Sequence, residues 1–277
     1  MPAGGMEPFF LPVDSGGQRL CLHHFPQTGS VLGAVVYVHP FAEEMNKSRR
    51  MAALQSRALA QAGFAVLQID LLGCGDSSGD FGDATWAAWV DDVLRAAAWL
   101  RQRHAAPLWL WGLRAGALLA AEAARRIDEP CNFLFWQPTT SGKTVLQQFL
   151  RLKAAADLLD GGAKGVVAGL RAQLAAGRAV EVAGYTVAPA LAEGLERATL
   201  QPPPRGAGRV EWFDVSAAAE ASLSPAAAMS APAWRGASFD VRQAVVSGPS
   251  FWQTTEIEDA PALLQATSAA LDEMVAA

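Results

Sequence analysis

The sequence has few cysteines and no long apolar run. Cys21, Cys74 and Cys131 lie far apart and form no CxxC pair, so neither a disulfide framework nor a zinc site is predicted. No uninterrupted apolar stretch reaches about 18 residues, so we expect no transmembrane segment. Residues 1–14 show no basic stretch followed by an apolar one, which argues against a signal peptide. We therefore expect a chain that works in the reducing cytoplasm.

Charge is also scarce. Only 18% of the 277 residues are charged, and the net charge is −5. This charge balance argues against a general role in nucleic-acid binding, because phosphate backbones are bound by basic surfaces. Hydrophobic residues make up 51% of the chain. This composition supports a sizeable core, and the length suits one large α/β domain or one domain with an insertion.

Strand and helix patterns alternate along the first half of the chain, which predicts a mostly parallel sheet flanked by helices. The strands are expected at 9–11, 19–25, 33–39, 64–70, 107–111 and 131–136, and the helices at 48–62, 85–103 and 114–127. Near Thr144 the pattern changes to short helices broken by glycines. The pattern then returns, with strands at 209–213 and 239–246 and helices at 225–231 and 259–276. The predicted organisation is a core over 1–144, a helical cap insertion over 145–208, and the rest of the core over 209–277.

The centre of the predicted sheet ends in Gly112-Leu-Arg-Ala-Gly116. This is the spacing of the G-x-S-x-G nucleophile elbow of α/β-hydrolases, a sharp turn from a strand into a helix. The central residue is Arg114, which stays protonated and cannot attack a substrate.

The base of a Ser-His-Asp mechanism is missing too. The histidines are at positions 23, 24, 39 and 104, so none falls in the stretch 247–255, where the catalytic histidine is expected. Asp214 could still supply the acid. We therefore predict that a Ser-His-Asp mechanism does not operate.

Arg114 admits two interpretations. At the N-terminus of a helix its guanidinium could form part of an anion-binding pocket, because free backbone N–H groups and the helix dipole favour negative charge there. Alternatively, Arg114 forms an ion pair with Glu43, Glu44 or Asp76 that holds this edge of the sheet closed. In either case an anion must lie near it, because a buried unpaired guanidinium is costly.

Two polar loops are expected beside the elbow. The first follows His39 and carries Glu43, Glu44, Asn46 and Lys47 as candidate site residues, with a solvated loop capped by Ser48 as the alternative. The carboxylates could act as general acids or bases. Two adjacent carboxylates do not make a metal site without further ligands, so no metal is predicted.

The second loop is Gly73-Cys-Gly-Asp-Ser-Ser-Gly79. Its G-x-G is not followed by the rest of a dinucleotide motif, so no cofactor is predicted. Asp76 is a third candidate acid or base, and a Cys74–His39 pair is a possible nucleophile and base. Most tryptophans are expected in the core, but Trp136 and Trp252 fall at strand exits and could line an apolar or sugar-binding pocket.

Three stretches together carry a family resemblance: Pro40 to Met51, Asp70 to Gly79, and Gly112 to Gly116. They resemble the exosortase A system-associated hydrolases, type 2, which are α/β-hydrolase-fold proteins encoded in bacterial exopolysaccharide and PEP-CTERM sorting loci. The resemblance implies an α/β-hydrolase fold with a helical cap. The family name implies hydrolysis, and the resemblance suggests that the elbow arginine is typical of this group.

Two functional hypotheses follow. In the first, the chain is a hydrolase-like protein that binds an anionic or acyl-bearing small molecule under the cap through Arg114. Any remaining catalysis would rest on Glu43, Glu44 or Asp76 acting on a bound water. In the second, the fold is catalytically inactive and serves ligand sensing or protein–protein contact. A homodimer or a partner protein is left open.

Overall fold

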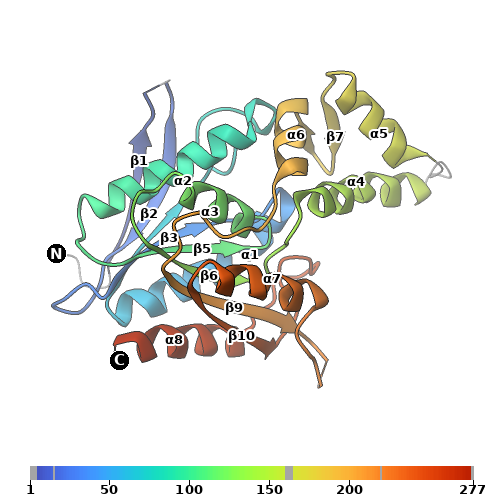
Figure 1. Ribbon diagram of the computed structural model, residues 1–277. Helices are drawn as coiled ribbons and strands as arrows, with labels where there is room; N and C mark the ends of the chain where they lie inside the picture. The colour runs from blue at the N-terminus through green and yellow to red at the C-terminus, as the bar shows by residue number, and fades with distance from the viewer. Residues whose placement is uncertain (1–4, 15, 160–164, 219, 276–277) are drawn as a thin grey trace.

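A central eight-stranded sheet organises the protein, as the computed structural model shows (Figure 1). The structure describes residues 5–14, 16–159, 165–218 and 220–275. The strand order is β1-β2-β4-β3-β5-β6-β9-β10, and only the β1–β2 and β2–β4 pairs are antiparallel. The strands are β1 Met6–Pro12, β2 Gln18–His24, β3 Gly33–Val38, β4 Phe64–Ile69, β5 Leu108–Leu113, β6 Cys131–Trp136, β9 Gly208–Ser216 and β10 Phe239–Ser247.

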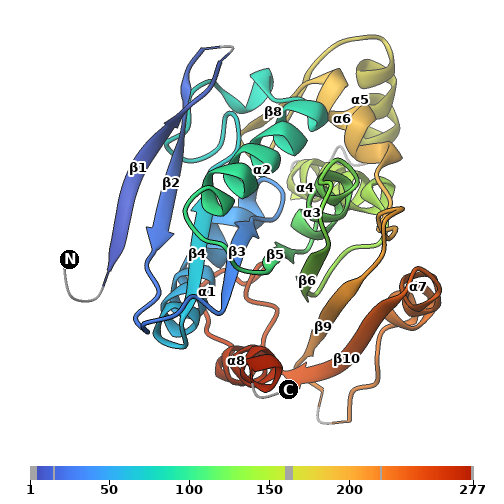
Figure 2. The same ribbon diagram turned by 60° about the vertical axis from the view of Figure 1, so that its left-hand side comes forward.

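Helices cover both faces of this sheet (Figures 1 and 2). On one face lie α1 (Glu43–Gln61) and α8 (Pro261–Val275), packed against each other and the sheet. On the other face lie α2 (Trp86–Arg101), α3 (Gly116–Ala124) and α7 (Pro225–Gly236), with the short helix η1 (Phe81–Asp83) before α2. Strands β3, β4, β5 and β6 are apolar apart from Gln68 and Asn132, because both faces of these strands are covered.

A separate group of elements lies between β6 and β9. It contains α4 Gly142–Leu159, α5 Val166–Ala175, β7 Val180–Val182, β8 Tyr185–Val187 and α6 Pro189–Arg197. The sequence predicted two or three short helices here; α5 and α6 are short, α4 has 18 residues, and the β7–β8 hairpin was not indicated. We refer to these elements as the cap. The predicted boundary at 145 falls inside α4, which begins three residues earlier. Helix α4 extends from the carboxyl-end edge of the sheet and forms one wall of the cavity described below.

The loop expected after His39 is largely helical, which corrects the sequence prediction. Helix α1 begins at Glu43 rather than near Ser48. Ser48 is not the cap; its hydroxyl donates to the carbonyl of Glu44, 2.7 Å away, within the helix. Acidic residues are favourable in the first turn because of the helix dipole, so Glu43 and Glu44 fit a helix start. The helix fixes the positions of Glu43, Glu44 and Lys47 relative to one another.

Candidate functional site

The elbow between β5 and α3 is built as its spacing predicts. Arg114 has a φ of 54°, in the left-handed region that is unusual for residues other than glycine. A Cβ on Gly116 would collide with the carbonyl oxygen of Val38, and a Cβ on Gly112 would collide with the backbone of Ala117. Both glycines are therefore required by close backbone approach, and the turn projects the side chain of Arg114 above the end of the sheet.

The Arg114 guanidinium is held by two side chains. Its Nε lies 3.3 Å from Oε1 of Glu44, and its Nη2 donates to Oε1 of Gln148 at 3.3 Å. The guanidinium carbon is 5.5 Å from the ring centre of Trp252, within cation–π range. The predicted ion pair is therefore confirmed for Glu44. Neither contact uses Nη1, for which the described residues show no hydrogen bond.

A cavity of about 320 Å³ opens beside this ion pair. Four separate parts of the chain contribute to it: the start of α1, the elbow, α4 of the cap, and the loop after β10. Its lining residues are Phe41, Glu43, Glu44, Lys47, Arg114, Val145, Gln148, Phe149, Leu152 and Gln253. Charged groups from the core thus face an apolar wall from the cap, an arrangement that suits an amphiphilic ligand.

Both carboxylates of this cavity have raised pKa values. Burial raises the pKa of Glu43, and Oε2 of its side chain is buried with no hydrogen-bond partner among the described residues. Burial also raises the pKa of Glu44, although Arg114 opposes the shift. Glu43 thus holds its proton to a higher pH than a solvated glutamate does. When Glu43 is protonated, the cavity is lined by two basic side chains, Lys47 and Arg114, and by one further carboxyl group, that of Glu44.

Gln253 lies in the stretch where a hydrolase histidine was expected. Its side-chain Nε2 is 3.5 Å from Oε1 of Glu44. Its backbone carbonyl oxygen accepts a hydrogen bond from Nζ of Lys47 at 3.3 Å. The sequence analysis did not select Gln253 or Gln148. Position 253 lies within the predicted stretch 247–255, so the loop was indicated although the residue was not. Nothing in the sequence pointed to Gln148, because the orientation of the cap helix has no local signature.

The hypothesis of a Cys74–His39 nucleophile pair is wrong. Nδ1 of His39 lies 2.8 Å from the carbonyl oxygen of Pro40 and must donate to it, because that oxygen can only accept. Nε2 then accepts from the N–H of Leu71, at 3.4 Å. Both ring nitrogens are therefore occupied by backbone. Cys74 is buried, which raises the pKa of its thiol and disfavours the thiolate.

Asp76 and Asn46 also lie outside the cavity. Asp76 is exposed on its loop, where its backbone N–H donates to Asp70 at 3.2 Å. Asn46 is exposed on the first turns of α1, and its amide lies 3.3 Å from the hydroxyl of Tyr185 in the cap hairpin. Both residues were predicted in the site. Asn46 contacts Tyr185 instead of lining the cavity, and Asp76 lies on a turn that packs against Asp70.

Trp136 and Asp214 have structural partners in the core. The ring of Trp136 is fully buried, and its Nε1 donates to Thr267 at 2.9 Å. Asp214 is buried in β9, where it accepts from Nε1 of Trp212 at 3.0 Å and from the N–H of Ser224 at 2.8 Å. The predictions that Trp136 lines a pocket and that Asp214 is available as a site residue are therefore corrected. Of the two tryptophans, only Trp252 contacts the site, through Arg114.

The geometry can now be compared with known proteins. Residues 29–159 match the family described as Serine aminopeptidase, S33, a match that covers slightly less than half of the chain. Solved structures superpose over almost all of it. Est1E from Butyrivibrio proteoclasticus has a TM-score of 0.63 at 14% identity and covers 96% of this chain and 97% of its own. A carboxyl esterase from Bacillus coagulans has a TM-score of 0.63 at 12% identity, with 98% of each chain covered.

The chain has the α/β-hydrolase fold. XC6422 from Xanthomonas campestris, described as an a/b serine hydrolase without lid, is also similar, with a TM-score of 0.56 at 15% identity over 99% of this chain and 95% of that one. Among curated proteins, human Protein ABHD12B is 32% identical over 96 residues. That match covers 34% of this chain and about a quarter of the human protein. The α/β-hydrolase fold fixes where a nucleophile would stand, and this position holds Arg114.

Two further observations bear on the site. No helix in the described part of the chain is both long and apolar enough to cross a membrane. Among the same residues, no three His, Cys, Asp or Glu side chains gather as a metal site would require.

Proposed function

We propose that this protein binds a small anionic or acyl-bearing molecule in the cavity beneath the cap, through Arg114. The observation that carries the proposal is the elbow itself. The fold uses this strained turn to present a catalytic side chain to its substrate, and here it presents a guanidinium whose Nη1 has no hydrogen bond among the described residues. Lys47 adds a second cation to the same cavity. Arginine forks match carboxylate and phosphate groups, so an anion is the natural partner.

The apolar part of the ligand would lie against α4. Val145, Phe149 and Leu152 follow one another at helical spacing and line the cavity, and Phe41 faces them from the core. Leu152 is 39% exposed, so this wall continues towards solvent. A ligand with an anionic head group at Arg114 and an apolar tail along α4 would match both the charged and the apolar residues that line the cavity.

Serine-type hydrolysis is not expected. Short p-nitrophenyl esters should show no turnover above background, and a fluorophosphonate probe should not label the protein. Arg114→Ser should also remain inactive, because the loop after β10 holds Gln253 where a base is needed. The wild type and Arg114→Ser are assayed side by side. Clear turnover by the variant would show that another residue serves as the base.

Anion binding should weaken as the pH rises. Below its raised pKa Glu43 is neutral, and above that pKa it adds a negative charge to the cavity. The titratable groups that interact electrostatically with the Glu43 carboxyl are Glu44, Lys47 and, from the cap, Tyr185. Octyl sulfate stays ionised throughout, so the pH dependence of its affinity, measured by calorimetry, reports the protein alone. Glu43→Gln should reduce this pH dependence and leave the part that belongs to Glu44, whose pKa is also raised. A profile in the variant that equals that of the wild type would contradict the assignment.

A catalytically inactive fold used for ligand sensing or protein contact is the second candidate. It is favoured by the loss of both nucleophile and base at a turn that keeps its shape. If the protein is an enzyme, Glu43 and Glu44 are the groups left for general acid–base work on a bound water. The resemblance to exosortase-associated hydrolases suggests a cytoplasmic role in an exopolysaccharide or exosortase system. Deletion of the gene should then alter exopolysaccharide or the sorting of surface proteins.

A further inference from the structure

A second cavity lies within the cap, where α4, α5 and α6 come together (Figure 1). Its volume is about 400 Å³. Among the described residues, none lines both this cavity and the one beside Arg114. Helix α4 is the wall between them, because Val145 lines the first cavity and the next residue, Leu146, lines the second. The cap thus holds a site of its own.

Apolar side chains form the floor of this second cavity. Leu146 of α4 and Ala192 of α6 border it and are almost fully buried, with exposed fractions of 1% and 3%. Pro189 lies three positions before Ala192, on the same face of α6. Leu174 and Ala175 line the opposite side from α5. A floor of this kind favours the hydrocarbon part of a ligand.

The polar edge of the cavity carries an excess of carboxylates. Glu193 and Glu196 continue the lining face of α6, and Arg171 of α5 donates from Nη1 to Oε1 of Glu196 at 2.7 Å. Glu193 pairs instead with Arg197, whose side chain is 76% exposed and does not line the cavity. Exposed pairs contribute little, so a ligand can share the Glu193 carboxylate at small cost. The described lining therefore has two carboxylates and one guanidinium.

We propose that this second cavity binds an amphiphilic amine, with its hydrocarbon chain on the apolar floor and its ammonium group at Glu193, beside Glu196. An ammonium gives Glu193 a partner inside the cavity and leaves the pair of Arg171 and Glu196 intact. An anion would face two carboxylates, and an alcohol would gain only the apolar contacts. The inference is independent of the proposed function, because the two cavities are lined by different residues.

Three probes with the same eight-carbon chain test this selection: octylammonium, octanol and octyl sulfate, each kept below its aggregation limit. Calorimetry should show octylammonium binding at least about fivefold more tightly than octanol. In amide proton–nitrogen NMR spectra, octylammonium should shift the signals of Ala175 and Gly177, which line the second cavity, more than those of Lys47 and Gln253 beside Arg114. Equal affinities for octylammonium and octanol, or shifts confined to Lys47 and Gln253, would overturn the proposal.

Variants of Glu193 test where the ammonium group lies. Its side chain is 61% exposed, so the fold should tolerate substitution, as an unchanged circular dichroism spectrum would verify. Glu193→Gln should weaken octylammonium binding at least several-fold and leave octanol binding unchanged. Glu193→Lys should bind octylammonium more weakly still. Glu181→Gln removes an exposed glutamate of β7 and should bind like the wild type. Octylammonium binding that is equal in the wild type and both Glu193 variants would overturn the assignment.

Discussion

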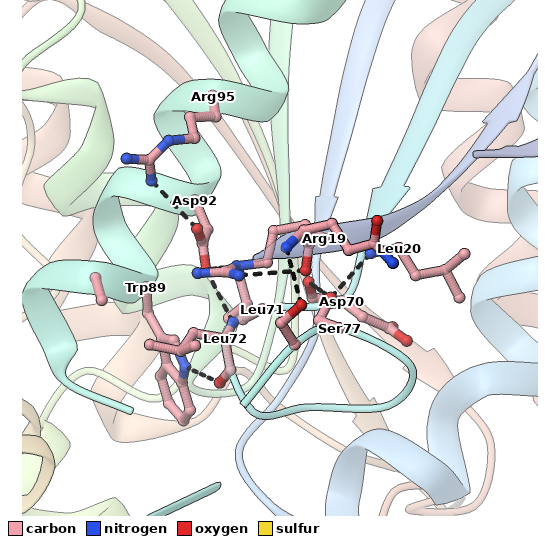
Figure 3. A network of polar contacts seen from close by, with 12 residues as sticks. Arg19, Leu20, Asp70, Leu71, Leu72, Ser77, Trp89, Asp92 and Arg95 are labelled. Carbon is pink, nitrogen blue, oxygen red and sulfur yellow. Dashed lines mark hydrogen bonds and ion pairs between the residues drawn. The ribbon is translucent and has the colours of Figure 1, made fainter. Parts of the chain in front are cut away.

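Replacement of Asp92 by alanine is expected to lower the free energy of unfolding by about 3–5 kcal/mol. Asp92 lies on α2 with no exposed surface, between Arg19 of β2 and Arg95 (Figure 3). Its Oδ2 accepts from Nε of Arg19 at 2.7 Å and from the N–H of Leu72 at 2.8 Å. Burial raises the pKa of Asp92 even though Arg19 opposes the shift, so desolvation destabilises the ionised carboxylate and its partners offset this only in part. Removal of the carboxylate would leave the buried guanidinium of Arg19 without its anion and the half-buried N–H of Leu72 without its acceptor.

The neighbouring Asp91 supplies the matched control. It pairs with Arg126, but both side chains are well exposed, so Asp91→Ala should cost less than about 1 kcal/mol. Urea unfolding followed by circular dichroism compares the two variants. The double variant Arg19→Met/Asp92→Leu should recover much of the loss, because it leaves no charge buried alone. Equal midpoints for Asp91→Ala and Asp92→Ala would contradict this account of the network.

The same network holds the loop that follows β4. Ser77 donates to the carbonyl of Asp70 at 2.6 Å and accepts from the N–H of Leu20 at 2.9 Å (Figure 3). Trp89 donates to the carbonyl of Leu72 at 2.9 Å. These bonds explain why Cys74 and Asp76 belong to a fixed structural turn, although their loop leaves the same edge of the sheet as the elbow.

Sequence reasoning recovers the core of the fold well. The strand β6 was predicted with its observed bounds, and α2 within two residues at its end, because apolar runs and the capping residue Thr85 mark them locally. The start of α1 was missed by five residues. The dense charge from Glu43 to Arg50 is typical of a loop. That Glu43 and Glu44 occupy the first turn of a helix, where acidic residues are favourable, is evident only from the structure.

Four of the predicted site residues lie together, and their role in a site stays a prediction. Arg114, Glu43, Glu44 and Lys47 were selected and lie in one cavity, because parallel strands bring their exit loops to the same edge. The choice of Glu44 over Glu43 as the partner of Arg114 depends on the rotation of α1, which no local pattern encodes. Gln148 reaches Arg114 from a cap helix 34 positions away, and Gln253 reaches Glu44 from 209 positions away. Contacts of that range require the tertiary structure.

Substitutions at the ion pair should change anion affinity in opposite directions. Arg114→Gln removes the positive charge and leaves Glu44 in the cavity, so an anion should bind at least about tenfold more weakly, a loss of ~1.4 kcal/mol or more. Glu44→Gln removes a competing negative charge while its amide oxygen can still accept from Arg114. The same anion should then bind about tenfold more tightly, because partly buried charges 3.3 Å apart are incompletely screened by water.

The central claim is that the elbow of this fold presents a cation to an anionic ligand. The most direct test is a calorimetric titration of the wild type, Arg114→Gln and Glu44→Gln with an eight-carbon anion, either octanoate or octyl sulfate, whichever binds the wild type more tightly. We predict that Glu44→Gln binds most tightly, the wild type next and Arg114→Gln most weakly. Binding by Arg114→Gln that equals binding by the wild type would contradict the claim.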